Sequence, residues 1–144
     1  MALFGGGFMR NGSTATATVT AYTTGLAKTT PSALKSESGD LAATSVGDYA
    51  LFGGGALSAR KDVGNCTAYN YAATKKSMES LSLPRRGLAA TTVGYFALFG
   101  GGYSASYGIV GNVDGYDSSL TRGSGISDLF ESVYNLAATS VGDY

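Results

Sequence analysis

The chain has 144 residues, of which 44% are hydrophobic, and its ten basic side chains balance ten acidic ones. A chain without net charge creates no long-range field that attracts nucleic acid or an anionic membrane, so we expect neither as a partner. Histidine is absent and Cys66 is the single cysteine, which excludes a Ser-His-Asp triad, thiolate clusters and most zinc sites. We therefore expect no cofactor, no metal and no enzymatic activity.

Targeting signals are not evident in these residues. No stretch approaches the roughly 18 apolar residues of a membrane span. The start, Met1 to Gly5, lacks the basic region and the long apolar run of a signal peptide. We therefore expect neither an export signal nor a membrane anchor in the chain, and its composition indicates no particular compartment.

One phrase of fifteen residues organises the chain. It occurs intact at 41–55 and at 88–102, while its second half opens the sequence at 2–7 and its first half closes it at 136–144. Equivalent residues are 47 or 48 positions apart, and repeats of this length without a helical pattern are typical of propeller blades. The abundance of Gly, Ser, Thr, Ala and Tyr favours short strands and tight turns, so the fold class is predicted to be all-β.

Each period is expected to contain four strands. The first is predicted at 41–46, followed by a turn at Gly47 and Asp48, and the second at 49–52. The third strand is predicted around a tyrosine, at 17–22 and 111–116. The fourth is predicted after that tyrosine, at 29–35, 77–83 and 127–133. In the last of these, residues 128–131 have a helical turn as the alternative.

Glycines follow the second strand in every repeat. We expect them to allow a sharp backbone course there, and the structural candidates are Gly5, Gly6, Gly53, Gly54, Gly100 and Gly101. They lack the following Lys-Ser/Thr of a phosphate loop, so nucleotide binding is not expected. The segments after the glycines, 8–14, 56–64 and 103–110, share almost no identity. Loop variation on a constant scaffold is where recognition usually lies.

The residues Leu88-Ala89-Ala90, Tyr95 to Gly101 and Tyr116-Asp117, with their equivalents along the whole chain, resemble the kelch repeat. That repeat runs from a small-apolar first strand through a hydrophobic strand ending in a glycine doublet to a later tyrosine. Kelch repeats usually carry a tryptophan after the tyrosine, and this chain has none, so it looks like a divergent subfamily, similar to bacterial and phage-associated kelch-like repeats. The resemblance implies a β-propeller with three four-stranded blades per chain.

The split phrase suggests how such a propeller would close. In kelch-like propellers a C-terminal strand typically completes the first blade, and here 136–144 would join the strands of 2–35. Three blades are half a ring. We therefore expect a head-to-tail homodimer with six blades and two seam blades built from both chains. The chain 1–144 is one unit with repeats at about 2–49, 50–96 and 97–144. The alternatives are a fragment of a longer propeller and a trimer of nine blades.

Two groups of residues are candidates for ligand binding. In the assembled ring, the turns after the first strands would present Asp48, Asp143 and Tyr95 around a channel mouth, suited to a cation or a polar ligand. The alternative is that aspartate merely suits a turn. The loop tyrosines Tyr103 and Tyr107 form a second candidate surface for protein or carbohydrate.

The sequence is compatible with three kinds of function. The first hypothesis is a non-enzymatic interaction module that presents variable loops to a protein or glycan partner. The second is a structural blade cassette from a larger repeat array, such as a surface or tail protein. An esterase-like or glycosidase-like enzyme has the least support. The adjacent Arg85 and Arg86 precede a first strand, where a solvated loop pair is favoured over a substrate clamp.

Overall fold

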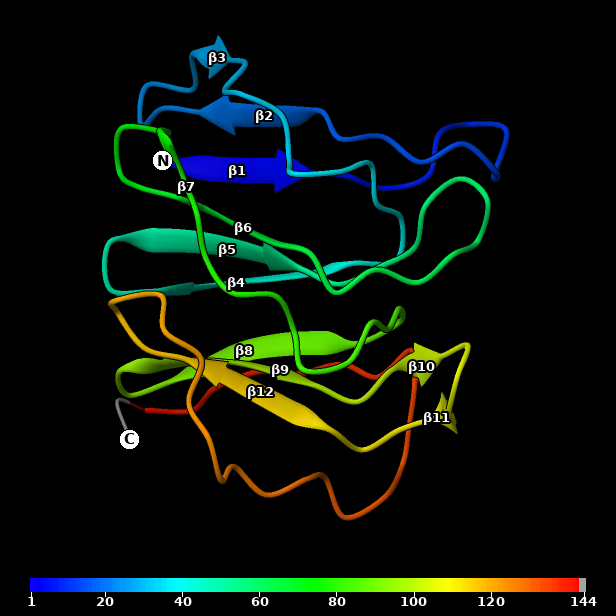
Figure 1. Ribbon diagram of the computed structural model, residues 1–144. Helices are drawn as coiled ribbons and strands as arrows, with labels where there is room; N and C mark the ends of the chain where they lie inside the picture. Colours follow the sequence, from blue (N-terminus) through cyan, green and yellow to red (C-terminus); the bar gives the residue numbers. More distant parts are fainter. Residues whose placement is uncertain (143–144) are drawn as a thin grey trace.

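The computed structural model describes residues 1–142 and shows an all-β chain, with no helix in that range long and apolar enough to cross a membrane. Three antiparallel sheets are stacked in chain order (Figure 1). The first sheet contains β1 (Ala2–Gly5), β2 (Val19–Tyr22) and β3 (Lys28–Thr29). The second contains β4 (Ala42–Val46), β5 (Tyr49–Gly53), β6 (Cys66–Tyr69) and β7 (Lys75–Lys76). The third contains β8 (Ala89–Val93), β9 (Phe96–Gly100) and β12 (Val113–Tyr116), and a small hairpin of β10 (Tyr103–Ser104) and β11 (Gly108–Ile109) follows β9.

The sheets share one register. Ala42 of β4 lies opposite Gly53 of β5, and Ala89 of β8 lies opposite Gly100 of β9. The first sheet has no strand equivalent to β4 or β8, so β1 pairs with β2 alone and its other edge is open. The first three strands of the repeat were thus predicted to within about two residues, and none of the sheets closes on itself.

The predicted fourth strands are misplaced. β3 and β7 are two residues long and directly follow the tyrosine turn, and the third sheet has a single bridge there, between Tyr116 and Arg122. The reason is a side-chain cap: Asn70 Oδ1 accepts hydrogen bonds from the backbone N–H groups of residues 72 and 74, at 3.1 and 2.9 Å. Asp117 caps the equivalent turn. The predicted ranges 29–35, 77–83 and 127–133 are therefore mainly loop, without a helical turn at 128–131.

The C-terminal segment, described as far as residue 142, contains no strand. It lies beside β8: the backbone N–H of Asn135 donates to Gly87 O at 2.6 Å, and Ser140 and Gly142 line a shallow pocket with Gly94. It therefore runs in the same direction as β8, at the opposite end of the stack from β1 (Figure 1). Within one chain, residues 136–142 do not complete the sheet begun at 2–35.

Each sheet carries the same aromatic pair, on β1 and β2 in the first, on β5 and β6 in the second, and on β9 and β12 in the third. The rings meet edge to face with centroids 5.9 to 6.0 Å apart, in the pairs Phe4–Tyr22, Phe52–Tyr69 and Phe99–Tyr116. Phe52 and Tyr69 pack with Val19 and Leu34 of the first repeat. The third pair packs in the same way within the core cluster of the second repeat. Edge-to-face pairs contribute about 0.5–1.5 kcal/mol beyond their buried area, so each pair stabilises its own sheet, and the second and third pairs also belong to the core between neighbouring sheets.

Glycines permit this contact between sheets. A Cβ added to Gly53 would lie 3.0 Å from the Phe99 ring, and one added to Gly5 would lie 3.1 Å from the Phe52 ring. The next glycine has a different role: Gly54 has φ +72°, and a Cβ there would meet Arg85 O at 2.8 Å. Gly6 and Gly101 repeat this conformation, with φ of +71° and +67°. Gly5 and Gly53 therefore leave room for a phenylalanine ring of the next sheet. The glycine that follows each of them has the left-handed backbone conformation that turns the chain.

The buried tyrosine of the second sheet, Tyr69, is expected to make the protein less stable at high pH. Tyr69 donates its O–H to Ser32 O at 2.7 Å, and burial raises its pKa from 10.0 to about 12. Because the folded pKa is the higher one, this stabilisation is complete below pH 10 and is lost as the pH rises toward 12. We predict that the free energy of unfolding falls by about 2–3 kcal/mol more in the wild type than in Tyr69→Phe between pH 9 and 12. Urea titrations at each pH measure this, and equal slopes for the two proteins would contradict it.

Candidate functional site

The predicted ligand residues of the turns lie at one edge of the stack. β4 and β8 lie side by side, joined by a hydrogen bond between Thr44 Oγ1 and Thr92 Oγ1 of 2.8 Å. The turns that follow these strands carry Asp48 and Tyr95, both exposed, the second by 83%. Asp143 lies outside the described residues. The structure thus brings the turns of Asp48 and Tyr95 to the same edge.

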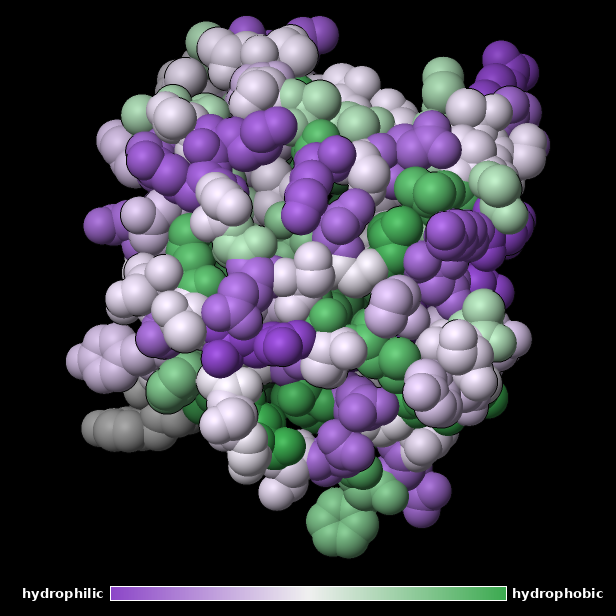
Figure 2. Space-filling model, viewed as in Figure 1, coloured by the Kyte–Doolittle hydropathy of each residue, from purple (hydrophilic) through white to green (hydrophobic). Residues whose placement is uncertain are grey.

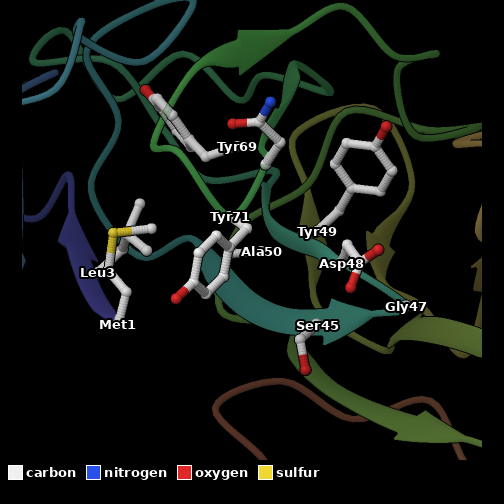
Figure 3. A pocket seen from close by; sticks show the side chains of 10 residues that line it. Met1, Leu3, Ser45, Gly47, Asp48, Tyr49, Ala50, Tyr69 and Tyr71 are labelled. Atoms are coloured by element: carbon white, nitrogen blue, oxygen red, sulfur yellow. The ribbon is translucent and has the colours of Figure 1, made fainter. Parts of the chain in front are cut away.

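A small pocket of about 210 Å³ lies between the N-terminus and the β4–β5 turn (Figure 3). Figure 3 shows Tyr71 beside Leu3 and Met1, and Asp48 beside Tyr49. Its full lining is Met1, Leu3, Ser45, Gly47, Asp48, Tyr49, Ala50, Tyr69, Asn70 and Tyr71. Tyrosine faces with one carboxylate suit a small polar ligand better than a metal ion, and residues 1–142 contain no group of three or more His, Cys, Asp or Glu placed to hold a metal.

The opposite edge of the stack is formed by the segments that follow the glycines. Each folds back as a small hairpin, closed by the pairs Phe8 with Ala15, Ala56 with Asp62, and Tyr103 with Ile109. All three hairpins lie on the side away from the β4–β5 and β8–β9 turns (Figure 1). We call residues 8–15, 56–62 and 103–109 the loop edge.

One side of the loop edge is held rigid by charge and aromatic contacts. The guanidinium carbon of Arg86 lies 4.6 Å from the centroid of the Tyr103 ring and the group forms an ion pair with Asp62. The Asp62 carboxylate also accepts the backbone N–H of Ala105 at 2.6 Å. Tyr103 is therefore half-buried and fixed, whereas Tyr107 at the hairpin tip is 73% exposed.

Arg85 corrects the expectation of a solvated arginine pair. Its side chain is fully buried, and Nη1 donates to Asp114 Oδ2 at 2.8 Å. Its Nε donates to Gly101 O at 2.8 Å, and Nη2 to Phe99 O at 3.0 Å. Asp114 also accepts the backbone N–H of Ser82 at 3.1 Å. The arginine is therefore neither solvated nor available to hold a substrate, and it joins the third sheet to the segment before it.

Cys66, the first residue of β6, is buried. Burial raises the pKa of its thiol, and its Sγ lies 3.6 Å from Tyr116 Oη. A thiol held protonated and out of solvent is a poor nucleophile. Cys66 therefore belongs to the core.

Comparison of the chain with protein-family models and with curated protein sequences found no match. Sequence reasoning missed the Arg85–Asp114 pair, because only its aspartate departs from a residue that recurs in the repeat. Position 114 is threonine in the other two repeats, at 20 and 67, and position 85 is serine in the first, at 38. Position 85 is valine in the third repeat, at 133, so it has no recurring residue from which the arginine departs.

Breaking the buried pair tests its structural role. We predict that Asp114→Asn lowers the free energy of unfolding by about 3–5 kcal/mol, because it leaves the Arg85 charge buried without a counter-ion. The control is Glu79→Gln, whose carboxylate is half-exposed and lies 3.8 Å from Arg122. That substitution should cost less than about 1 kcal/mol. Chemical denaturation followed by circular dichroism measures both, and similar costs for the two variants would show that the buried pair has no special weight.

Proposed function

We propose that this protein is a non-enzymatic binding scaffold that presents its loop edge to a protein or glycan partner. The observation that carries the proposal is the contrast between the two parts of the repeat. The turn glycines and Phe–Tyr pairs recur in every sheet. The three hairpins of the loop edge share a position but not a sequence. A constant frame with variable hairpins on one side is the arrangement by which repeat folds produce binding surfaces.

The side chains of the loop edge suit recognition. Tyr107, Ile109 and Met9 are exposed at or near hairpin tips, and Arg60 lies over the Phe8 ring at 5.1 Å from its centroid. Tyrosine and arginine are enriched where binding energy concentrates, because they combine large contact area with polar groups. Tyr103, fixed by its neighbours, loses little conformational freedom on binding.

The larger architecture belongs to the same proposal. The three sheets are kelch-like propeller blades, and two chains associate head to tail into a six-bladed ring. Its support is that successive antiparallel sheets stack through their faces and that both ends of the stack remain open. In such a ring Asp48 and Tyr95 of both chains face a common axis. A nine-bladed trimer and a cassette within a longer structural array are the competing assemblies.

Binding through the loop edge is tested on glycan and protein arrays. We predict that Tyr107→Ala reduces the affinity for the ligand that the wild type binds by about tenfold or more, because aromatic side chains contribute most of the binding energy of such surfaces. The double variant with Tyr103→Ala and Tyr107→Ala should reduce the affinity further. The matched control is Tyr95→Ala, since that ring is as exposed but lies on the opposite edge.

Two results would contradict the proposal. If Tyr95→Ala abolishes binding and Tyr107→Ala does not, the turn edge is the binding surface. If the folded and assembled wild type binds nothing on either array, the structural cassette is favoured.

A further inference from the structure

The chain contains the same sheet-to-sheet contact twice. In the first, Phe52 covers Gly5 and buries Leu34. In the second, Phe99 covers Gly53, and Leu81 is buried in the same core cluster. Both rings are at most 5% exposed. Each contact therefore has two halves: a phenylalanine on the following sheet, and a glycine with a leucine on the preceding one.

The third set of these residues is divided between the two ends of the stack. Phe4, on the first sheet, is 65% exposed. At the other end Leu129, the equivalent of Leu34 and Leu81, is 36% exposed. A Cβ on Gly100 would have its nearest neighbour at 3.6 Å, and the nearest atoms in the described part of the chain belong to Val113 and Leu129 rather than to an aromatic ring. Figure 2 shows hydrophobic side chains reaching the surface in the lower half of the view, over the third sheet. Each end therefore carries one unfilled half of the contact.

Polar contacts between the sheets also occur twice within the chain, and the residues of a third such contact lie at the two ends of the stack. Lys75 Nζ donates to Ala33 O at 3.0 Å across the first contact, and Arg122 Nη1 donates to Ser80 O at 3.1 Å across the second. The next members of these two series are Lys28 at one end of the stack and Asp128 at the other, both exposed. Both contacts end on a backbone carbonyl oxygen, so the equivalent contact between the two ends would join Lys28 Nζ to the carbonyl oxygen of Asp128.

Unpaired backbone is likewise found at both ends of the stack. Among residues 1–142, the outer edge of β1 has no partner strand. A groove of about 530 Å³ lies next to it, lined by residues of β1, by Thr18 and Thr20 on the β2 side, and by Ala43 of β4. Residues 137–141 have the sequence of the strand that fills this place in the other sheets, and they have no strand partner. Applied to these residues, the β4–β5 register places Ala138 opposite Phe4 and Ser140 opposite Ala2.

We propose that the two ends of the stack bind each other between copies of this chain. Phe4 of one copy covers Gly100 of the next, Lys28 meets Asp128, and residues 137–141 of that next copy pair antiparallel with β1. The occupant of the groove is thus a second copy, which supplies the missing first strand of the first sheet. This inference rests on the proposed ring and gives it a specific contact and register, and it closes the exposed strand edge that would otherwise promote aggregation.

The register is tested by cysteine cross-linking. We predict that the double variant Ala2→Cys with Ser140→Cys forms an intermolecular disulfide under mild oxidation, seen as a linked dimer on a non-reducing gel. The control is Ala2→Cys with Thr139→Cys, because a shift of one residue turns the side chain to the other face of the strand. Cys66 is buried and does not compete. Equal cross-linking in both variants, or in neither, overturns the register.

The face contact is tested by solution mass. We predict that the wild type has at least twice the chain mass of 14.6 kDa, and that Phe4→Glu returns it to 14.6 kDa with an unchanged circular dichroism spectrum. Gly100→Ala has room in the separate chain and should weaken the assembly from the other end, because its Cβ would meet the incoming ring. The control, Tyr107→Glu, lies on the loop edge and should leave the mass unchanged.

These outcomes separate the two proposals. A wild type that stays at 14.6 kDa at high concentration, or a folded Phe4→Glu that assembles as the wild type does, overturns the contact. A filament or a larger ring that Phe4→Glu disperses supports the contact and contradicts the two-chain ring. Loss of ligand binding in Tyr107→Glu without loss of mass shows that the two surfaces are independent.

Discussion

The rest of the structure depends on a phenylalanine ring seated on a glycine of the preceding sheet. A glycine without Cβ lets the ring approach the strand backbone, and the tyrosine beside it closes the contact edge to face. Fully burying a phenylalanine is worth about 1.5–3 kcal/mol, and two such rings are buried here. Because both halves of the contact recur in the sequence, the second sheet stacks on the first in the same way as the third stacks on the second.

This constraint explains why some parts of the repeat vary and others do not. One polar link between the second and third sheets is the arginine–aspartate pair. Between the first and second sheets, the position of the aspartate is occupied by Thr67, whose hydroxyl accepts the backbone N–H of Lys35 at 3.0 Å. Either link is compatible with the same aromatic contact. The hairpins of the loop edge lie outside that contact, so their sequences differ without disturbing the stack. Recognition and assembly therefore use different edges of the same sheets.

Much of the fold is predictable because its signals are local. Glycine-aspartate turns and short apolar strands placed β4 and β5 to within a residue, since turn chemistry and strand pattern act over a few positions. The fourth strands were misplaced because the caps of Asn70 and Asp117 reverse the chain earlier than the pattern indicates. Of the candidate site, the exposed tips at Asp48, Tyr95 and Tyr107 follow from turn positions. The burial of Arg85 and the pocket around Tyr71 depend on contacts between distant residues, which periodicity does not encode.

The central claim is that residues 137–141 form a β-strand when they pair with β1 of another copy of the chain. Hydrogen–deuterium exchange of its backbone amides at high protein concentration tests this directly, with the equivalent residues of β8, 90–93, as the internal reference. The account predicts that the two peptides are protected to a similar degree, and that protection of 137–141 disappears on dilution to the single chain. Exchange of 137–141 at the rate of an unfolded peptide at every concentration would contradict it.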